Sequence, residues 1–232
     1  MNAAVAFTRE HLRAPLTLVL LISLPVAFVG FSAQVLGEFA DALGGQLAGD
    51  AAAALGAGWA AAFIAGSLGF FQIVSSRGAD RRLALAGRGP ARVALARLAS
   101  SVVLALIAVA AAFVALGLAR GFAHPAHEAA ALLAFALIYL GVGSIIGSVI
   151  SAPLEGSLAV AFVFMLDVFS GPGMSEGGGS VYSVSREAGE LLIRGASGQG
   201  SSAGDWLAAA AWAFGALVLA FLSYVIRARS RV

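Results

Sequence analysis

The chain has 232 residues, of which 60% are hydrophobic and only 11% are charged, whereas about a quarter of the residues in an ordinary soluble domain are charged. This balance excludes a soluble globular domain and predicts an all-α polytopic membrane protein. The sequence contains no cysteine and no lysine, so it offers no disulfide, no thiolate for a metal and no Walker A lysine, and we expect no ATP site of the Walker A kind in it.

Six apolar windows are long enough, or nearly long enough, to cross a hydrocarbon core about 30 Å thick, which takes about 20 helical residues. We therefore predict six transmembrane helices and treat residues 1–232 as a single transmembrane domain. The windows cover residues 16–36, 51–74, 98–119, 129–150, 156–172 and 206–226. The first apolar run is too long for a signal peptide and no small-residue cleavage site follows it, so we expect it to be kept as a crossing.

Residues 1–15 precede the first crossing, and we expect them to form a short amphipathic helix on the cytoplasmic surface. Val5 and Leu12 fall on one side of such a helix, and Arg9 falls on another. The apolar side is thin, so a tail without fixed structure is the alternative.

Small residues recur at helical spacing in two of the predicted crossings. Gly66 and Gly69 give the second crossing a surface that another helix can approach closely, and Gly143 and Gly147 do the same in the fourth. The glycines of the fourth crossing could also suggest a nucleotide-binding loop. No strand precedes them, however, so we predict a contact between helices.

Residues 75–97 form a basic insert between the second and third crossings, with six arginines against the single acid Asp80. One arginine in the middle of a membrane helix costs about 3 kcal/mol, so the insert must lie in water. Residues 79–86 have the composition of a short helix that Gly87 ends, and Pro90 suits the first position of the next helix. We expect a transverse surface helix, a Gly-Arg-Gly break and then the third crossing. A solvated loop that only fixes the topology is the alternative.

The arginines also orient the chain, because short arginine-rich loops stay on the cytoplasmic side of the membrane. With the N-terminus inside and six crossings, eleven arginines lie inside and three lie outside, namely Arg120, Arg186 and Arg194. We therefore expect cytoplasmic N- and C-termini in the cell inner (plasma) membrane. Arginines at this position suit the lipid bilayer and a partner protein better than nucleic acid, so we expect no nucleic-acid partner.

The connection between the third and fourth crossings contains His124, His127 and Glu128. Two histidines and a nearby carboxylate can bind zinc. Pro125 breaks the helix that would align the two imidazoles, and no fourth ligand is evident. We therefore predict a short external turn and no metal site.

The fifth crossing is short, because residues 157–170 run into a cluster of helix breakers that opens with Gly171 and Pro172. A tight cytoplasmic turn, residues 151–156, is expected to precede it. Asp167 lies about one turn before its end, so this carboxylate lies either at the outer mouth of a water-filled path or paired inside the bundle. We expect the mouth, because less than one turn separates Asp167 from the break. Asp167, Gly171 and Pro172 are thus candidate path or gate residues.

Residues 171–205 form the largest external segment. After its glycines we predict an amphipathic helix, capped by Ser183 or Ser185 and carrying an ion pair between Glu190 and Arg194. Because this helix follows a short crossing, we expect an external re-entrant helix between the fifth and sixth crossings, protected from lipid by protein. A helix resting on the membrane surface is the alternative.

This order of parts resembles the membrane subunits of type 2 ATP-binding-cassette (ABC) exporters. The basic insert SSRGADRRLALAGRGPARVALARL is similar to the coupling helix of that family, and FSGPG is similar to the break before its external re-entrant helix. The helix before the first crossing and the small-residue fourth crossing with its short turn also match. The chain departs from the family at Gly78, Ala79 and Asp80, where a glutamate and a glycine-threonine pair are frequent, and in the glycine-rich first half of its external hairpin.

The resemblance implies that two six-helix subunits, identical or different, form the substrate path as a dimer. It also implies that two copies of a separate ABC-type ATPase subunit dock on the coupling loops, so this chain would hydrolyse no ATP itself and would need no cofactor. The residues that match the coupling segment of the family are Arg77, Asp80, Arg81, Arg82, Leu83, Leu85 and Arg88.

The leading hypothesis is therefore the permease subunit of an exporter for an amphiphilic or lipid-like substrate. A secondary transporter would need ionisable residues in mid-membrane, and Asp167 is the only clear candidate. A membrane scaffold or immunity protein without transport activity is a further alternative. An intramembrane enzyme has the least support, because no crossing brings a histidine or a pair of carboxylates near a nucleophile.

Overall fold

The computed structural model describes residues 15–42, 44, 45, 47, 49–83, 87, 89–174 and 183–229. Every regular element in this part of the chain is a helix, as predicted. The helices are α2 (Pro15–Ala42), α3 (Gly49–Leu83), α4 (Pro90–Arg120), α5 (Pro125–Val149), α6 (Pro153–Ser170), α7 (Arg186–Ala196) and α8 (Ala203–Arg229). The helix predicted before the first crossing lies in residues 1–14, outside the described residues.

Five of the described helices are long and apolar enough to cross a membrane, namely α3, α4, α5, α6 and α8. The chain is therefore a multi-pass membrane protein. The first predicted crossing falls on α2, which has 28 residues and would extend about 42 Å at 1.5 Å per residue. Many of its side chains lie outside the described part, so the first crossing, and with it a total of six, stays a prediction.

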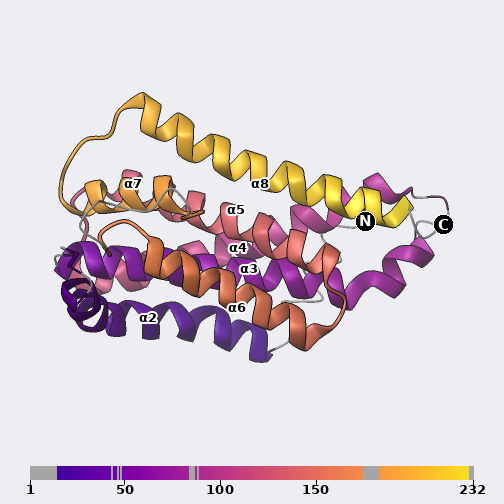
Figure 1. Ribbon diagram of the computed structural model, residues 1–232, viewed down its shortest axis with the longest axis horizontal. Helices are drawn as coiled ribbons and strands as arrows, with labels where there is room; N and C mark the ends of the chain where they lie inside the picture. The colour runs from indigo at the N-terminus through magenta and orange to yellow at the C-terminus, as the bar shows by residue number, and fades with distance from the viewer. Residues whose placement is uncertain are drawn as a thin grey trace.

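The long helices lie along one another and form an elongated bundle (Figure 1). The connection from α3 to α4, the turn from α5 to α6 and the last turns of α8 lie at one end, which we call the basic end (Figure 1). At the opposite end, α7 lies beside the first turns of α5 (Figure 1). We call this the α7 end, and the two ends correspond to the two sides of the membrane in the predicted topology.

Helix α3 is the centre of the bundle. It packs against α2, α4, α5, α6 and α7, and it buries a larger share of its residues than the other four membrane-spanning helices. Its closest partner is α5, because glycines let the two backbones approach. A Cβ atom added to Gly143 would overlap the Gly66 carbonyl oxygen, and one added to Gly69 would lie 2.6 Å from the Leu140 carbonyl oxygen. The predicted small-residue contact is confirmed.

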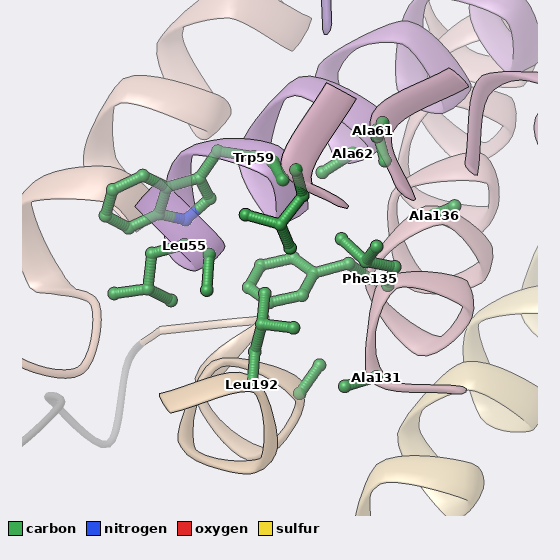
Figure 2. Packing of buried hydrophobic residues seen from close by; sticks show 14 of the residues in the cluster. Leu55, Trp59, Ala61, Ala62, Ala131, Phe135, Ala136 and Leu192 are labelled. Atoms are coloured by element: carbon green, nitrogen blue, oxygen red, sulfur yellow. The ribbon is translucent and has the colours of Figure 1, made fainter. Parts of the chain in front are cut away.

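The short helix α7 contributes to the same core. Figure 2 shows Leu192 of α7 against Phe135 of α5, with Leu55 and Trp59 of α3 beside them. All four side chains are buried. The inner face of α7 is thus covered by protein, as the re-entrant interpretation requires. The depth of α7 in the bilayer stays a prediction.

Two predicted boundaries are wrong. Helix α3 continues through Leu83, so residues 79–83 extend this helix and do not form a separate one. Ala, Leu and Arg favour a helix, and the single Gly78 costs only about 1 kcal/mol, so nothing there stops it. Helix α6 begins at Pro153, because proline suits the first position of a helix, and the predicted turn at residues 151–156 is shorter than expected.

The predicted break before the third crossing is present. Gly87 and Gly89 have φ angles of 87° and 70°, in the left-handed region that glycine adopts readily. Pro90 then begins α4. The basic segment is thus a helical extension, a glycine break and a new helix.

Candidate functional sites at the two ends of the bundle

At the basic end, Arg77 links α3 to the end of α5. Its guanidinium donates to the carbonyl oxygens of Gly147 and Ile150, the latter at 3.0 Å. The last carbonyls of a helix have no partner within the helix, so this arginine satisfies groups that would otherwise be left without a donor. Arg77 therefore connects the start of the basic segment to the turn between α5 and α6.

Two of the other predicted coupling residues are described. Arg82 is exposed, and its Nε donates to the carbonyl of Gly78 one turn earlier in α3, at 3.3 Å. Leu83 is half-buried at the end of the same helix. The side chains of Asp80 and Arg81, and the whole of residues Leu85 and Arg88, lie outside the described residues.

A buried polar cluster joins α3 and α4 near the basic end. Gln72 Nε2 donates to the Arg97 carbonyl at 3.4 Å, and Ser101 Oγ donates to Gln72 Oε1 and lies 3.1 Å from the same carbonyl. Arg97 itself is only 6% exposed. The sequence interpretation missed this cluster, although a glutamine inside an apolar window was a usable signal.

At the α7 end, Asp167 is the centre of a second polar cluster. Its side chain is 2% exposed. The carboxylate accepts hydrogen bonds from Tyr139 Oη at 2.8 Å, Ser183 Oγ at 2.8 Å, and Ser185 Oγ and N at 2.6 and 3.2 Å. Of the two environments that the sequence allowed, the structure therefore has the paired, buried one. Asp167 therefore does not lie at the open mouth of a water-filled path, where we expected it.

The two other candidate gate residues lie beside this carboxylate. Gly171 is buried against α3, where an added Cβ atom would lie 3.1 Å from Trp59 Cζ2. Pro172 is buried under α7, where a Cβ atom on Gly189 would lie 2.5 Å from Pro172 Cγ. The break after α6 is therefore wedged between α3 and α7.

Helix α7 forms where the sequence predicted it, but its start is held differently. Ser185 occupies the N-cap position and makes no side-chain cap hydrogen bond; both predicted cap hydroxyls, those of Ser183 and Ser185, donate to Asp167 instead. The predicted pair of Glu190 and Arg194 is present at 3.5 Å. The hydrogen bond from Arg186 to Glu190 (3.0 Å) raises the pKa of the arginine above its ordinary value.

An ion pair joins the end of α7 to the start of α8. Arg194 forms a second ion pair with Asp205 in the first turn of α8. Asp205 also accepts from the backbone N of Ser202 at 2.9 Å, and its own backbone N donates to Ser202 Oγ at 3.2 Å. This reciprocal arrangement is a capping box, with aspartate in the place of the usual glutamate.

The predicted turn between α4 and α5 contains a buried ion pair between Arg120 and Glu128, whose side chains are 8% and 0% exposed. The rings of the two histidines hydrogen-bond to other groups. His127 Nε2 lies 2.9 Å from the Leu191 carbonyl oxygen, and His124 Nε2 lies 3.3 Å from that of Gly198. In the part of the chain that the structure describes, no cluster of three or more potential metal ligands forms.

An open pocket of about 350 Å³ lies beside these histidines. Its lining comes from the N-cap and first turn of α5 and from the connection between α7 and α8: His124, Pro125, Ala126, His127, Gln199 and Gly200. The histidines therefore join the start of α5 to the connection between α7 and α8, and their ring nitrogens hydrogen-bond to backbone carbonyls.

Comparison with known families gives no independent identification. No protein-family model matches the sequence, and no curated protein matches it significantly. The resemblance to type 2 exporters therefore stays a prediction from the order of parts, and the function must be argued from the geometry of the two ends.

Proposed function

We propose that the chain is the transmembrane permease subunit of an ABC exporter in the inner (plasma) membrane. Two such subunits, identical or different, form the substrate path, and two separate ATPase subunits drive it through the connection between α3 and α4. The observation that carries the proposal is the arginine-rich segment 75–97 at the basic end, the end at which the α5–α6 turn and the last turns of α8 also lie (Figure 1).

The length of α3 suits it to transmit motion from an ATPase into the membrane, and we call its projecting turns, residues 75–83, the lever. Its 35 residues extend about 52 Å, whereas the hydrocarbon core is about 30 Å thick. With the crossing predicted at residues 51–74, residues 75–83 project about 14 Å beyond it at 1.5 Å per residue and carry arginines into water. Because α3 also packs against five other helices, a force on the projecting turns would move the centre of the bundle.

Arg77 supports transmission to a second helix. Its guanidinium bonds to the last carbonyls of α5, so a displacement of the lever would carry the end of α5 and the turn to α6 with it. Helix α5 in turn packs against α7. If the ATPase binds one arrangement of the bundle more tightly than the other, it shifts the population of the bundle toward that arrangement.

The exposed arginines suit an acidic partner. Arg82 and Arg92 are exposed on the two sides of the glycine break. Charges at a wet rim of this kind set the orientation and the association rate of a complex more than its affinity. We expect carboxylates on the ATPase to face this segment.

Purification of the tagged chain in mild detergent tests the proposal. We expect a second protein, the ABC-type ATPase subunit, to be recovered in a fixed ratio to this chain. It should carry a Walker A loop and hydrolyse ATP. Recovery of the chain alone, under conditions that preserve its fold, would contradict the proposal and favour a secondary transporter or a membrane scaffold or immunity protein.

A charge reversal tests the role of the basic segment. The double variant Arg81→Glu/Arg82→Glu should stay in the membrane but lose either the partner or the coupling of transport to ATP hydrolysis. Arg229→Glu/Arg231→Glu makes the same change in charge near the end of the chain and should keep both. Wild-type pumping by the first variant would rule out the proposed role of the arginines.

A further inference from the structure

The start of α7 is held by a single buried carboxyl group. The Asp167 carboxylate, on α6, accepts three hydrogen bonds from Ser183 and Ser185, just before α7, and one from Tyr139 of α5. Three separate parts of the chain therefore meet at one charge. A carboxylate is tolerated in such a buried place only while its donors remain, because an uncompensated buried charge is strongly unfavourable.

Packing holds the middle of α7 against the bundle, where Leu191 and Leu192 are 1% and 0% exposed. Its buried residues are mostly small: of the six, Ala188, Gly189, Gly195 and Ala196 have little or no side chain. An isolated helix of 11 residues is also marginal by itself. At the start of α7 the buried residues are Ala188 and Gly189, which have little or no side chain, so the hydrogen bonds to Asp167 are the specific attachment there.

The two ends of α7 are attached in different ways. The end of the helix is joined to α8 by the ion pair of Arg194 and Asp205, whose side chains are partly exposed. Beyond it, residues 197–200 are exposed, and Gly198 has a φ of 69°. The start is joined to α6 by a fully buried charge. Loss of the buried attachment would leave α7 connected to α8 and free at its start.

The docked arrangement also leaves the indole nitrogen of Trp59 without a hydrogen-bond partner among the described residues. Trp59 is 1% exposed, close to Gly171, and its Nε1 has no hydrogen-bond acceptor within the described structure. A buried donor without an acceptor disfavours the state in which it is buried. Undocking of α7 and the neighbouring break after α6 would open a route for water to this indole.

We propose that Asp167 is a latch that holds α7 docked over the α7 end of the bundle, and that α7 undocks as a unit when the latch opens. The latch consists of Asp167, Tyr139, Ser183 and Ser185. This inference stands apart from the transport proposal, because it concerns a motion within this chain and needs neither an ATPase nor a substrate.

The absence of cysteine from the chain allows a direct test. Ala188→Cys places a single thiol on the buried face of α7, and its rate of modification by a membrane-impermeant maleimide in proteoliposomes reports undocking. Asp167→Ala should raise this rate at least tenfold. Ser170→Ala should not, because this hydroxyl at the same helix end donates only to Leu166 of its own helix.

Two further thiols separate a latch from general loosening. Ala105→Cys is buried in α4, and Asp167→Ala should leave its slow modification unchanged. Gln199→Cys is exposed and should react quickly in every background. Equal acceleration at positions 188 and 105, or no acceleration at 188, would overturn the latch.

The serines provide a variant that keeps the charge. Ser183→Ala/Ser185→Ala removes two donors to the carboxylate without touching α6, so modification at position 188 should again accelerate, by less than in Asp167→Ala. This double variant keeps the test decisive if Asp167→Ala fails to fold. An unchanged rate at position 188 in the folded serine variant would show that the carboxylate does not hold α7, and would overturn the proposal.

Discussion

Glu128 and Asp167 are two acids that the bundle buries in different ways. Glu128 faces a guanidinium, Arg120, and forms a buried ion pair, whereas Asp167 faces three hydroxyls and a backbone N–H. The ion pair closes the turn between α4 and α5, while the hydroxyl cluster joins elements far apart in sequence. The two acids therefore differ in what their loss should do.

For the ion pair we expect a global effect. Glu128→Gln leaves Arg120 buried without a carboxylate, which should lower the free energy of unfolding by about 3–5 kcal/mol, measured by thermal unfolding in detergent. Glu187→Gln, at a partly buried position in the first turn of α7, should change it little. A Glu128→Gln variant that unfolds at the wild-type temperature would contradict a stabilising ion pair.

Arg77 gives a second prediction at the residue scale. Arg77→Gln removes the charged donor to the end of α5, and hydrogen bonds to charged groups contribute about 1.5–3 kcal/mol each. Thermal unfolding should therefore shift to lower temperature. Arg82→Gln, whose guanidinium is exposed, is the matched control and should unfold like the wild type; equal behaviour of the two variants would remove Arg77 from the link between α3 and α5.

Sequence patterns could not reveal the partners of the buried acids. Tyr139, Asp167 and the two serines are separated by up to 46 positions along the chain and share no periodicity. A short crossing with an acid, followed by a Ser-x-Ser before an amphipathic helix, was the available signal. It allowed two environments for Asp167, and only the fold selects between them.

At the scale of elements, the contact between α3 and α5 depends on residues without side chains. Gly143→Ala would place a Cβ atom on the Gly66 carbonyl, and overpacking of this kind costs about 1–3 kcal/mol. Gly215→Ala in α8 has no neighbour within 4 Å, so it should leave stability unchanged or raise it slightly. Thermal unfolding of the two variants compares them; equal stability would mean that the helices do not cross at Gly143.

The helix contacts were predictable and the helix ends were less so. Spacing of glycines fixes a face of a helix, so Gly66, Gly69, Gly143 and Gly147 identified the contact correctly. Boundaries depend on weak signals. Gly78 disfavours a helix too weakly to end α3. Pro153 starts α6 within residues 151–156, which we predicted to be a turn. The Gly87 and Gly89 break was predictable, because two glycines and a proline act together.

At the scale of the whole molecule, the surface fits a lipid environment. Large apolar side chains are exposed along α6 and α8, including Leu158, Phe162, Phe214 and Leu219. In water, apolar exposure of this extent would drive aggregation, whereas hydrocarbon accepts it. Within the described part of the chain, the charges collect toward the two ends, which is the distribution that a multi-pass chain requires.

The central claim is that the arginine-rich connection between α3 and α4 faces the cytoplasm, where an ATPase can reach it. Single cysteines at Ala84→Cys and Gln199→Cys, in a chain that has no cysteine of its own, test it with an impermeant maleimide on intact cells. We predict that position 199 is labelled in intact cells and position 84 only after the membrane is permeabilised. Labelling of position 84 from the medium would contradict the orientation, and with it the docking of an ATPase on this segment.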